Sequence, residues 1–153
     1  MTSNDHHRAK SRNGASSVDT IMPFLLDTDT CIYALKNNEN VLRILLSKTR
    51  DEILVSVITE GELRTGAAKS ASPIKTLRAV ENFLHPLAIA DFTSHDAAVY
   101  AHVRAKLERA GTPIGPLDTL IASQAIAREL TLVSNNEREF RRVSGLRLEN
   151  WTR

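Results

Sequence analysis

Short apolar runs alternate with helical segments along most of this chain, and this alternation limits the folds that it can adopt. The run Phe24-Leu25-Leu26 predicts a buried strand, and the residues after it have the spacing of a helix through Ile32 and Leu35. Further strands are predicted at 53–55, 87–89 and 130–133, with a short last element near 146–148. Strand-helix alternation of this kind predicts an α/β fold with a mostly parallel central sheet and helices on both faces.

Start and stop signals set the bounds of several predicted helices. Ser56 is the predicted N-cap of the helix that follows the second strand, and Gly111 is the predicted C-cap of a helix over 99–110. Other helical patterns cover 41–46 and the stretch from Pro73 to about Leu84.

The composition changes near the start of the first predicted strand. Residues 1–21 are polar and almost free of large apolar groups, so we expect a disordered N-terminal extension there. Residues 22–153 are expected to form one domain, which is long enough for a substantial core. The formal net charge of +2 is too small to indicate nucleic-acid binding by itself.

Cysteine usage and hydropathy suggest a compartment. Cys31 is the only cysteine, which excludes an internal disulfide framework and agrees with a reducing environment. No apolar run approaches the length of a membrane span, and the polar N-terminus lacks the hydrophobic region of a signal peptide. We therefore expect a cytoplasmic protein with no membrane partner.

The segment from Pro113 to Ile121 forms a rigid turn ahead of an apolar helix face. Pro116 suits the first position of that helix, which places Asp118 in its first turn. The backbone N–H groups and the helix dipole stabilise a carboxylate there. Such an acid can be a simple helix-start device or part of a site, and further acids elsewhere in the chain favour a site.

Other polar groups follow the predicted strands directly. Asp27 comes after the first strand, and the segment from Ser134 to Phe140 follows the strand at 130–133. Ligands of α/β proteins collect at the carboxyl ends of the strands, so we expect these groups to lie near one another.

Glu62 lies inside a predicted helix, on the same face as Gly66. Glycine in a helix interior costs about 1 kcal/mol relative to alanine, so its presence needs a reason. Open space beside Glu62 is one reason; close helix packing, or an early end of the helix, is another. Glu62 could also be a structural acid paired with a nearby arginine.

Several carboxylates at one edge repel one another unless a cation neutralises them. Oxygen ligands without histidine or cysteine partners suit Mg²⁺, or Mn²⁺, and the histidines of this chain show no zinc-site spacing. Magnesium at a strand edge commonly handles phosphate. Metal-activated water attacking a phosphodiester is the simplest mechanism that these residues suggest.

Four segments of the chain stand out together: FLLDTDTCIYALK, SVITEGELRTGAAKS, RAKLERAGTPIGPLDTLIASQA and LTLVSNNEREFRRVSGLRLENW. They resemble the PIN-domain ribonucleases, and specifically the VapC-type toxins of bacterial toxin–antitoxin pairs. They occur in the order and spacing of that family and cover nearly all of the chain from Pro23 to Trp151. The resemblance implies a PIN domain over 22–153, a three-layer α/β sandwich, and a Mg²⁺-dependent endoribonuclease, with tRNA as one substrate by analogy.

The resemblance also implies roles for particular residues. Asp27, Glu62 and Asp118 correspond to the first three acids of the family site, with Asp27 and Asp118 as direct metal ligands. Asn136 stands where many PIN domains have a fourth acid. An asparagine can still coordinate through its carbonyl or orient a water, and Glu139 is close enough in sequence to compensate.

Further positions are expected to support the site. Ser134 resembles the hydroxyl residue near the family site. Asp29 replaces an asparagine common in relatives, and of metal binding through water and capping of the first helix, we favour capping. The basic residues Arg138, Arg141 and Arg142 are candidate RNA contacts, against the alternative of an ordinary solvated helix face.

The resemblance implies protein partners as well. It predicts a cognate antitoxin whose C-terminal segment covers the active cleft, together with a homodimer and larger toxin–antitoxin hetero-oligomers. The apolar helix surface between Val41 and Leu87 could serve a dimer interface or the core alone.

Two other functions are compatible with parts of the sequence. The D-x-D-x-T pattern at Asp27 is similar to the first motif of haloacid-dehalogenase-type phosphatases. Those enzymes also need a downstream lysine and a late pair of acids, whereas no lysine follows Lys106 and no such pair is present. A non-catalytic module that binds RNA or protein is the third hypothesis.

Overall fold

Five parallel strands form the centre of the molecule. The structure, a computed structural model, describes residues 22–153, so the predicted disordered extension at 1–21 lies outside the described residues. The strand order is β3-β2-β1-β4-β5, and every pairing among the described strands is parallel. The strands are β1 (Phe24–Leu26), β2 (Ile53–Ser56), β3 (Ala88–Ala90), β4 (Thr131–Val133) and β5 (Arg147–Glu149).

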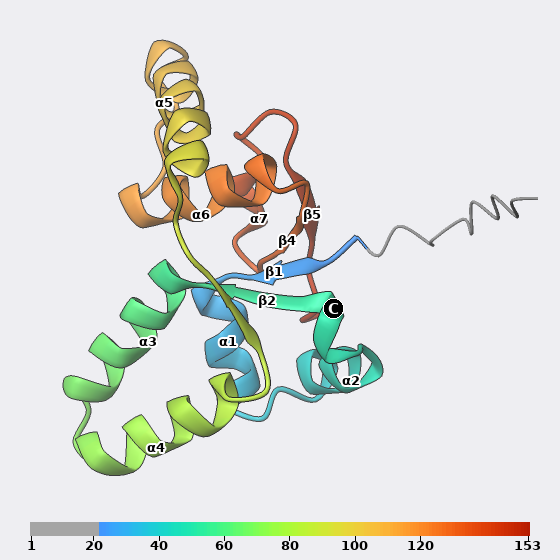
Figure 1. Cartoon of the computed structure of the whole chain (residues 1–153), viewed down its shortest axis with the longest axis vertical. Helices are drawn as coiled ribbons and strands as arrows, with labels where there is room; N and C mark the ends of the chain where they lie inside the picture. The colour runs from blue at the N-terminus through green and yellow to red at the C-terminus, as the bar shows by residue number, and fades with distance from the viewer. Residues whose placement is uncertain (1–21) are drawn as a thin grey trace, which may run out of the picture.

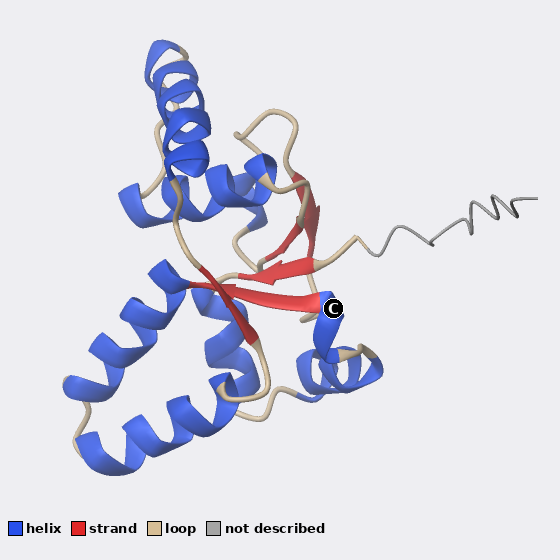
Figure 2. Cartoon of the chain, viewed as in Figure 1, coloured by secondary structure: helices blue, strands red, loops and turns tan. Residues whose placement is uncertain are grey.

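Helices cover both faces of this sheet, as the three-layer prediction requires (Figures 1 and 2). A short 3₁₀ turn (Arg50–Glu52) leads into β2. One face carries α1 (Thr28–Leu35), α2 (Glu39–Ser47), α3 (Val57–Ala68) and α4 (Pro73–Leu84). The other face carries α5 (Ser94–Arg109), α6 (Pro116–Ala127) and α7 (Glu137–Phe140).

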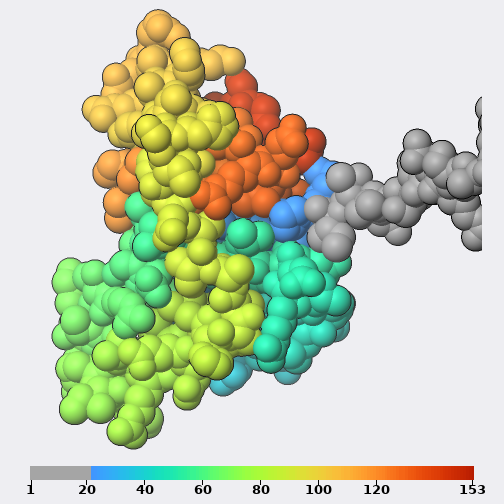
Figure 3. All heavy atoms as spheres, viewed as in Figure 1, coloured from blue at the N-terminus to red at the C-terminus, as the bar shows by residue number. Residues whose placement is uncertain are grey.

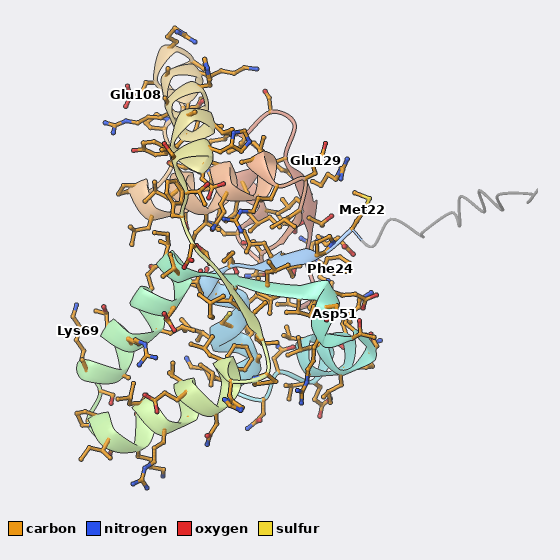
Figure 4. All side chains as sticks on the ribbon, viewed as in Figure 1. Met22, Phe24, Asp51, Lys69, Glu108 and Glu129 are labelled. Carbon is orange, nitrogen blue, oxygen red and sulfur yellow. The ribbon has the colours of Figure 1, made fainter. Side chains whose placement is uncertain are left out.

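Alternate residues of the central strands feed two separate cores. Leu26 packs with the helices of the α1–α4 face, whereas its neighbour Leu25 packs with the helices of the α5–α7 face. Both leucines are completely buried, which explains why the central strand is a continuous apolar run. Trp151 closes one end of the first core by packing edge-on against Phe24 (labelled in Figure 4), with ring centroids 5.3 Å apart.

The strand order changes direction beside β1. Successive strands β2 and β3 extend the sheet to one side, and β4 and β5 extend it to the other. In the view of Figure 3, α3 and α4 form the green lower part of the molecule, and α5 and α6 form the yellow and orange upper part. In open α/β sheets such a reversal leaves a crevice at the carboxyl ends of the strands, where ligands bind. Here that position lies at the ends of β1 and β4.

Most predicted elements are confirmed, with small differences at their ends. The third strand is Ala88–Ala90, one residue later than predicted, and the last is Arg147–Glu149. The C-cap of α5 is Ala110; Gly111 follows it with φ of +69°, a left-handed conformation that glycine adopts without strain. The 3₁₀ turn and α7 were not predicted, because three or four residues carry too little periodicity. No helix within the described part of the chain has the length and apolar character needed to cross a membrane.

Candidate active site

Asp27 and Ser134 lie side by side at the edge where the strand order reverses. Leu26 pairs with Val133 as the last residue of each strand, so the next residue of each chain segment emerges at the same place. The backbone N–H of Asp27 donates to the carbonyl of Val133 over 3.1 Å, which extends the pairing by one step. The parallel register therefore brings together two residues that are distant in sequence.

Asp27 is also the N-cap of α1. Its Oδ1 accepts a hydrogen bond from the backbone N–H of Thr30 at 2.7 Å, and the residue is only 3% exposed. The favoured interpretation of Asp29 as the cap is therefore wrong. Asp29 lies in the first turn and is exposed, because the helix begins one residue after Asp27.

Burial sets the acidity of Asp27. It raises the pKa of this carboxyl from 3.8 to about 6, although hydrogen bonds from Ser134 and Thr30 lower it. The charge of Asp29 adds a smaller increase. A carboxylate that is hard to ionise in a folded protein is typical of a site that binds a cation or a proton.

Asp118 occupies the first turn of α6, as predicted. Pro116 is at the start of that helix and Gly115 is its N-cap; a Cβ on Gly115 would lie 3.4 Å from the Asp118 Oδ2, so the carboxylate folds back over the N-cap residue. The pKa of Asp118 is raised to about 6. Burial is the largest cause, and the negative charges of Asp27, Glu139, Glu62 and Asp29 raise it further. Four other acids are therefore close enough to act on Asp118.

Glu62 extends from α3 and is held by a hydroxyl. Its Oε1 accepts a hydrogen bond from Thr28 Oγ1 at 2.7 Å. The alternative of an arginine partner is wrong, because Arg64 pairs with Glu60 at 3.5 Å and with Glu81 at 3.3 Å. Sequence reasoning missed Thr28, since nothing in the sequence links residues 34 positions apart.

Gly66 faces open space, as one of the two interpretations predicted. Apart from its chain neighbours and the nearby backbone of its own helix, no described atom lies within 4 Å of a Cβ built on it, and α3 continues beyond it to Ala68. Neither close packing nor an early helix end explains this glycine.

We expect Gly66→Ala to raise the free energy of unfolding by about 0.5–1 kcal/mol, because alanine loses less backbone entropy in a helix. Urea unfolding would measure this change. Gly61 is equally open in the same helix, so Gly61→Ala is the matched variant and should give a similar gain. A loss of stability in both variants would contradict the expectation.

The β4–α7 loop contributes a connected set of polar groups. Ser134 Oγ accepts from the backbone N–H of Asn136 at 2.9 Å, and Asn136 Nδ2 donates to Glu139 Oε2 at 3.1 Å. Within residues 22–153 no donor reaches the side-chain carbonyl of Asn136. Asn136 thus fixes the acid that was predicted to compensate for it.

The acids gather without closing a metal cage. Within residues 22–153, no three carboxylate, histidine or cysteine side chains are arranged tightly enough to enclose an ion. The acids are nevertheless close enough for the charges of Asp27, Glu139 and Glu62 to raise the pKa of Asp118.

The three candidate RNA-contact arginines differ in their surroundings. All are exposed. Arg141 pairs with Glu137 at 3.3 Å, and Arg142 donates to the carbonyl of Pro113 at 3.0 Å. Arg138 makes no ion pair with any described residue, so its role as a phosphate contact stays a prediction.

Comparison with known proteins identifies the class to which this fold and acidic edge belong. The PIN domain family matches residues 24–146. The tRNA(fMet)-specific endonuclease VapC of Salmonella typhimurium is 40% identical over 131 residues, covering 86% of this chain and 99% of the relative. The protein of the same name from Shigella flexneri is 38% identical, covering 86% of this chain and 100% of its own length.

Solved structures agree with these sequences. A chain of the DNA-bound VapBC complex from Salmonella typhimurium is 41% identical, with a TM-score of 0.81 over 85% of this chain and 98% of that one. VapBC2 from Rickettsia felis, bound to a DNA fragment from its promoter, gives 38% identity and a TM-score of 0.80, with 85% and 99% covered. The chain belongs to the PIN-domain family, among the VapC ribonucleases of toxin–antitoxin systems. This membership leaves the phosphatase alternative without support.

Proposed function

We propose that this protein is a Mg²⁺-dependent endoribonuclease, the toxin of a toxin–antitoxin pair. The observation that carries the proposal is the convergence of acids on Asp118, whose pKa is raised to about 6 by burial and by the charges of Asp27, Glu139, Glu62 and Asp29. These acids come from the start of α1 and from α3, α6 and α7, and they meet where the sheet changes direction, in a chain of a ribonuclease family.

The donor set fits a divalent cation. Its ligands would be carboxylate oxygens with amide and hydroxyl groups beside them, which is the chemistry that Mg²⁺ and Mn²⁺ prefer. A bound cation would also lower the pKa of both Asp27 and Asp118, and so oppose the effects of burial and of repulsion between the acids. We assign direct ligation to Asp27 and Asp118, with Glu62 completing the shell or acting through a bound water.

Each residue of the site then has a definite task. Bound Mg²⁺ would supply an activated water and neutralise phosphate charge. Ser134 and Thr30 hold the Asp27 carboxylate in one orientation through hydrogen bonds. Asn136 holds Glu139 in the same way. With the carboxylates of Asp27, Glu62 and Glu139 held by hydrogen bonds, these side chains lose little freedom when the cation and a phosphodiester bind.

Basic side chains around the site would draw RNA toward it. Arg138 is the first candidate for a phosphate contact, with Arg141 and Arg142 available if their present partners release them. Because such contacts read the backbone, the choice of RNA depends on its shape. Two of the similar proteins are named tRNA(fMet)-specific endonucleases. The first substrate to test is therefore tRNA, beginning with tRNA(fMet).

A cognate antitoxin and self-association belong to the same proposal. The related structures are VapBC complexes. A groove of about 730 Å³ runs between α1, α3 and α4; apolar residues line much of it, and the charged side chains of Glu62, Lys36 and Lys75 lie among them. This groove suits an apolar peptide segment of an antitoxin that reaches the acids. The cytoplasmic location and the homodimer stay predictions.

Incubation of the purified protein with total cellular RNA and with tRNA tests this function. We expect discrete cuts in Mg²⁺ that disappear in EDTA and return when Mg²⁺ is restored. The Asp27→Asn protein, purified in parallel, controls for contaminating nuclease. Cutting by the wild-type protein that persists in EDTA would contradict the metal dependence. No cutting at all by folded, antitoxin-free protein would contradict the proposed activity and favour the binding-module alternative.

A further inference from the structure

Thr28 links two acids of the site from the start of α1. It directly follows Asp27, and its side chain reaches across to Glu62 on α3. We propose that Thr28 is a positioning residue that holds the Glu62 carboxylate among the acids, and that a buried hydroxyl on Thr59 supports it. This inference rests on the proposed function, since it concerns the same metal site.

The direction of these hydrogen bonds follows from the number of protons available. Thr28 Oγ1 lies 2.7 Å from Glu62 Oε1 and 3.2 Å from Thr59 Oγ1. An ionised carboxylate only accepts, so the single hydroxyl proton of Thr28 is donated to Glu62. Thr59 must then donate its own proton to the Thr28 oxygen. The result is a chain that runs from Thr59 through Thr28 to Glu62 and ends on a charge, where hydrogen bonds are strongest.

The chain of hydrogen bonds begins at a buried side chain. Thr59 is completely buried, whereas Thr28 and Glu62 are half-buried. A buried hydroxyl without a partner is unfavourable, so Thr59 holds Thr28 in one rotamer.

Glu62 needs this restraint because its neighbours repel it. The negative charge of Glu62 raises the pKa of Asp118, and so does the charge of Asp27. A free glutamate side chain would turn toward solvent to escape those charges, with three rotatable bonds to do so. The short hydrogen bond from Thr28 opposes that movement before any metal arrives. The first turn of α1 therefore orients two acids at once: Asp27 through the Thr30 N–H, and Glu62 through Thr28.

The test compares Thr28→Val, which removes the hydroxyl at nearly constant volume, with Thr28→Ser, which keeps it. Mn²⁺ affinity of the RNA-free protein is measured by calorimetry, beside thermal unfolding and the Mg²⁺ dependence of RNA cleavage. We expect Thr28→Val to weaken Mn²⁺ binding on the order of 10- to 100-fold, the usual effect of losing a group that orients a metal ligand. Thr28→Ser should restore binding. Thr65→Val is the control, because the only described hydrogen bond of its exposed hydroxyl goes to the Gly61 carbonyl of its own helix.

A double-mutant cycle separates positioning from simple packing. In a Glu62→Ala background, adding Thr28→Val should change Mn²⁺ affinity no further, since the carboxylate that Thr28 orients is gone. Wild-type Mn²⁺ affinity in Thr28→Val, or full additivity in the cycle, would overturn the inference. Should the valine variant not fold, Thr28→Ala replaces it in the same measurements. If the wild-type protein itself binds no Mn²⁺ and cuts no RNA, the proposed function fails instead.

Discussion

Asp27→Asn is expected to reduce RNA cleavage about a thousandfold and to make the metal-free protein more stable at neutral pH. Loss of a direct ligand removes several kcal/mol of charge stabilisation, and each 1.4 kcal/mol is about a factor of ten in rate. Asparagine is as good an N-cap as aspartate, so the hydrogen bond to the Thr30 N–H is kept. The buried charge disappears. Since burial raises the pKa of Asp27 from 3.8 to about 6, that charge costs about 3 kcal/mol when ionised.

Single-turnover cleavage at saturating Mg²⁺ and urea unfolding at pH 7.5 in EDTA would measure the two effects. Thr65→Val serves again as a variant that should change neither. A more stable but inactive protein is the signature of a residue kept for function at the expense of stability. Full activity in Asp27→Asn would remove Asp27 from the site. A large loss of stability would show instead that the acid is structural.

The second large effect is a pH-dependent stabilisation by Mg²⁺. The pKa values of Asp27 and Asp118 are both raised to about 6 in the folded protein. Between about pH 4 and 6 the folded state therefore binds more protons than the unfolded chain, and the stability of the metal-free protein falls as the pH rises through this range. Mg²⁺ replaces those protons above pH 6. At a hundred times its dissociation constant it should add about 2.7 kcal/mol, which raises the melting temperature on the order of 10 °C.

Thermal unfolding with Mg²⁺ and with EDTA at pH 7.5 and pH 5 tests this expectation. NaCl at matched ionic strength controls for general screening of charge. The Mg²⁺ effect should be large at pH 7.5, small at pH 5 and absent in Asp27→Asn. An equal effect at both pH values would mean that the ion binds elsewhere, away from the two acids.

The sequence predicted the layers of the fold well, because most of its strands are continuous apolar runs between helices with clear caps. Ser56 and Pro116 begin α3 and α6 as expected. Asp27 and Asp118 were found for the same reason, since each stands at a fixed position relative to the end of a strand or the start of a helix. Their roles as metal ligands stay a prediction.

What could not be predicted depends on contacts between distant residues. Asp27 and Asp29 both suit an N-cap position, and only the end of β1 decides between them. The hydrogen bond from Arg142 to the carbonyl of Pro113, 29 residues away, could not be predicted either, and its expected RNA contact stays a prediction. Thr28 gave no signal at all, because its partner Glu62 is brought to it only by the packing of α1 against α3.

The order of the acids along the chain has a consequence for the newly made protein. Asp27 and Glu62 belong to the α1–α4 half of the molecule, whereas Asp118 belongs to α6 in the other half. The strand β4, whose register carries Ser134 to Asp27, comes only at Thr131–Val133. A chain still emerging from the ribosome thus lacks a complete set of acids until most of it has been translated. We therefore expect RNA cleavage only from a chain that extends past β4, because a shorter one lacks the strand that places Ser134 beside Asp27.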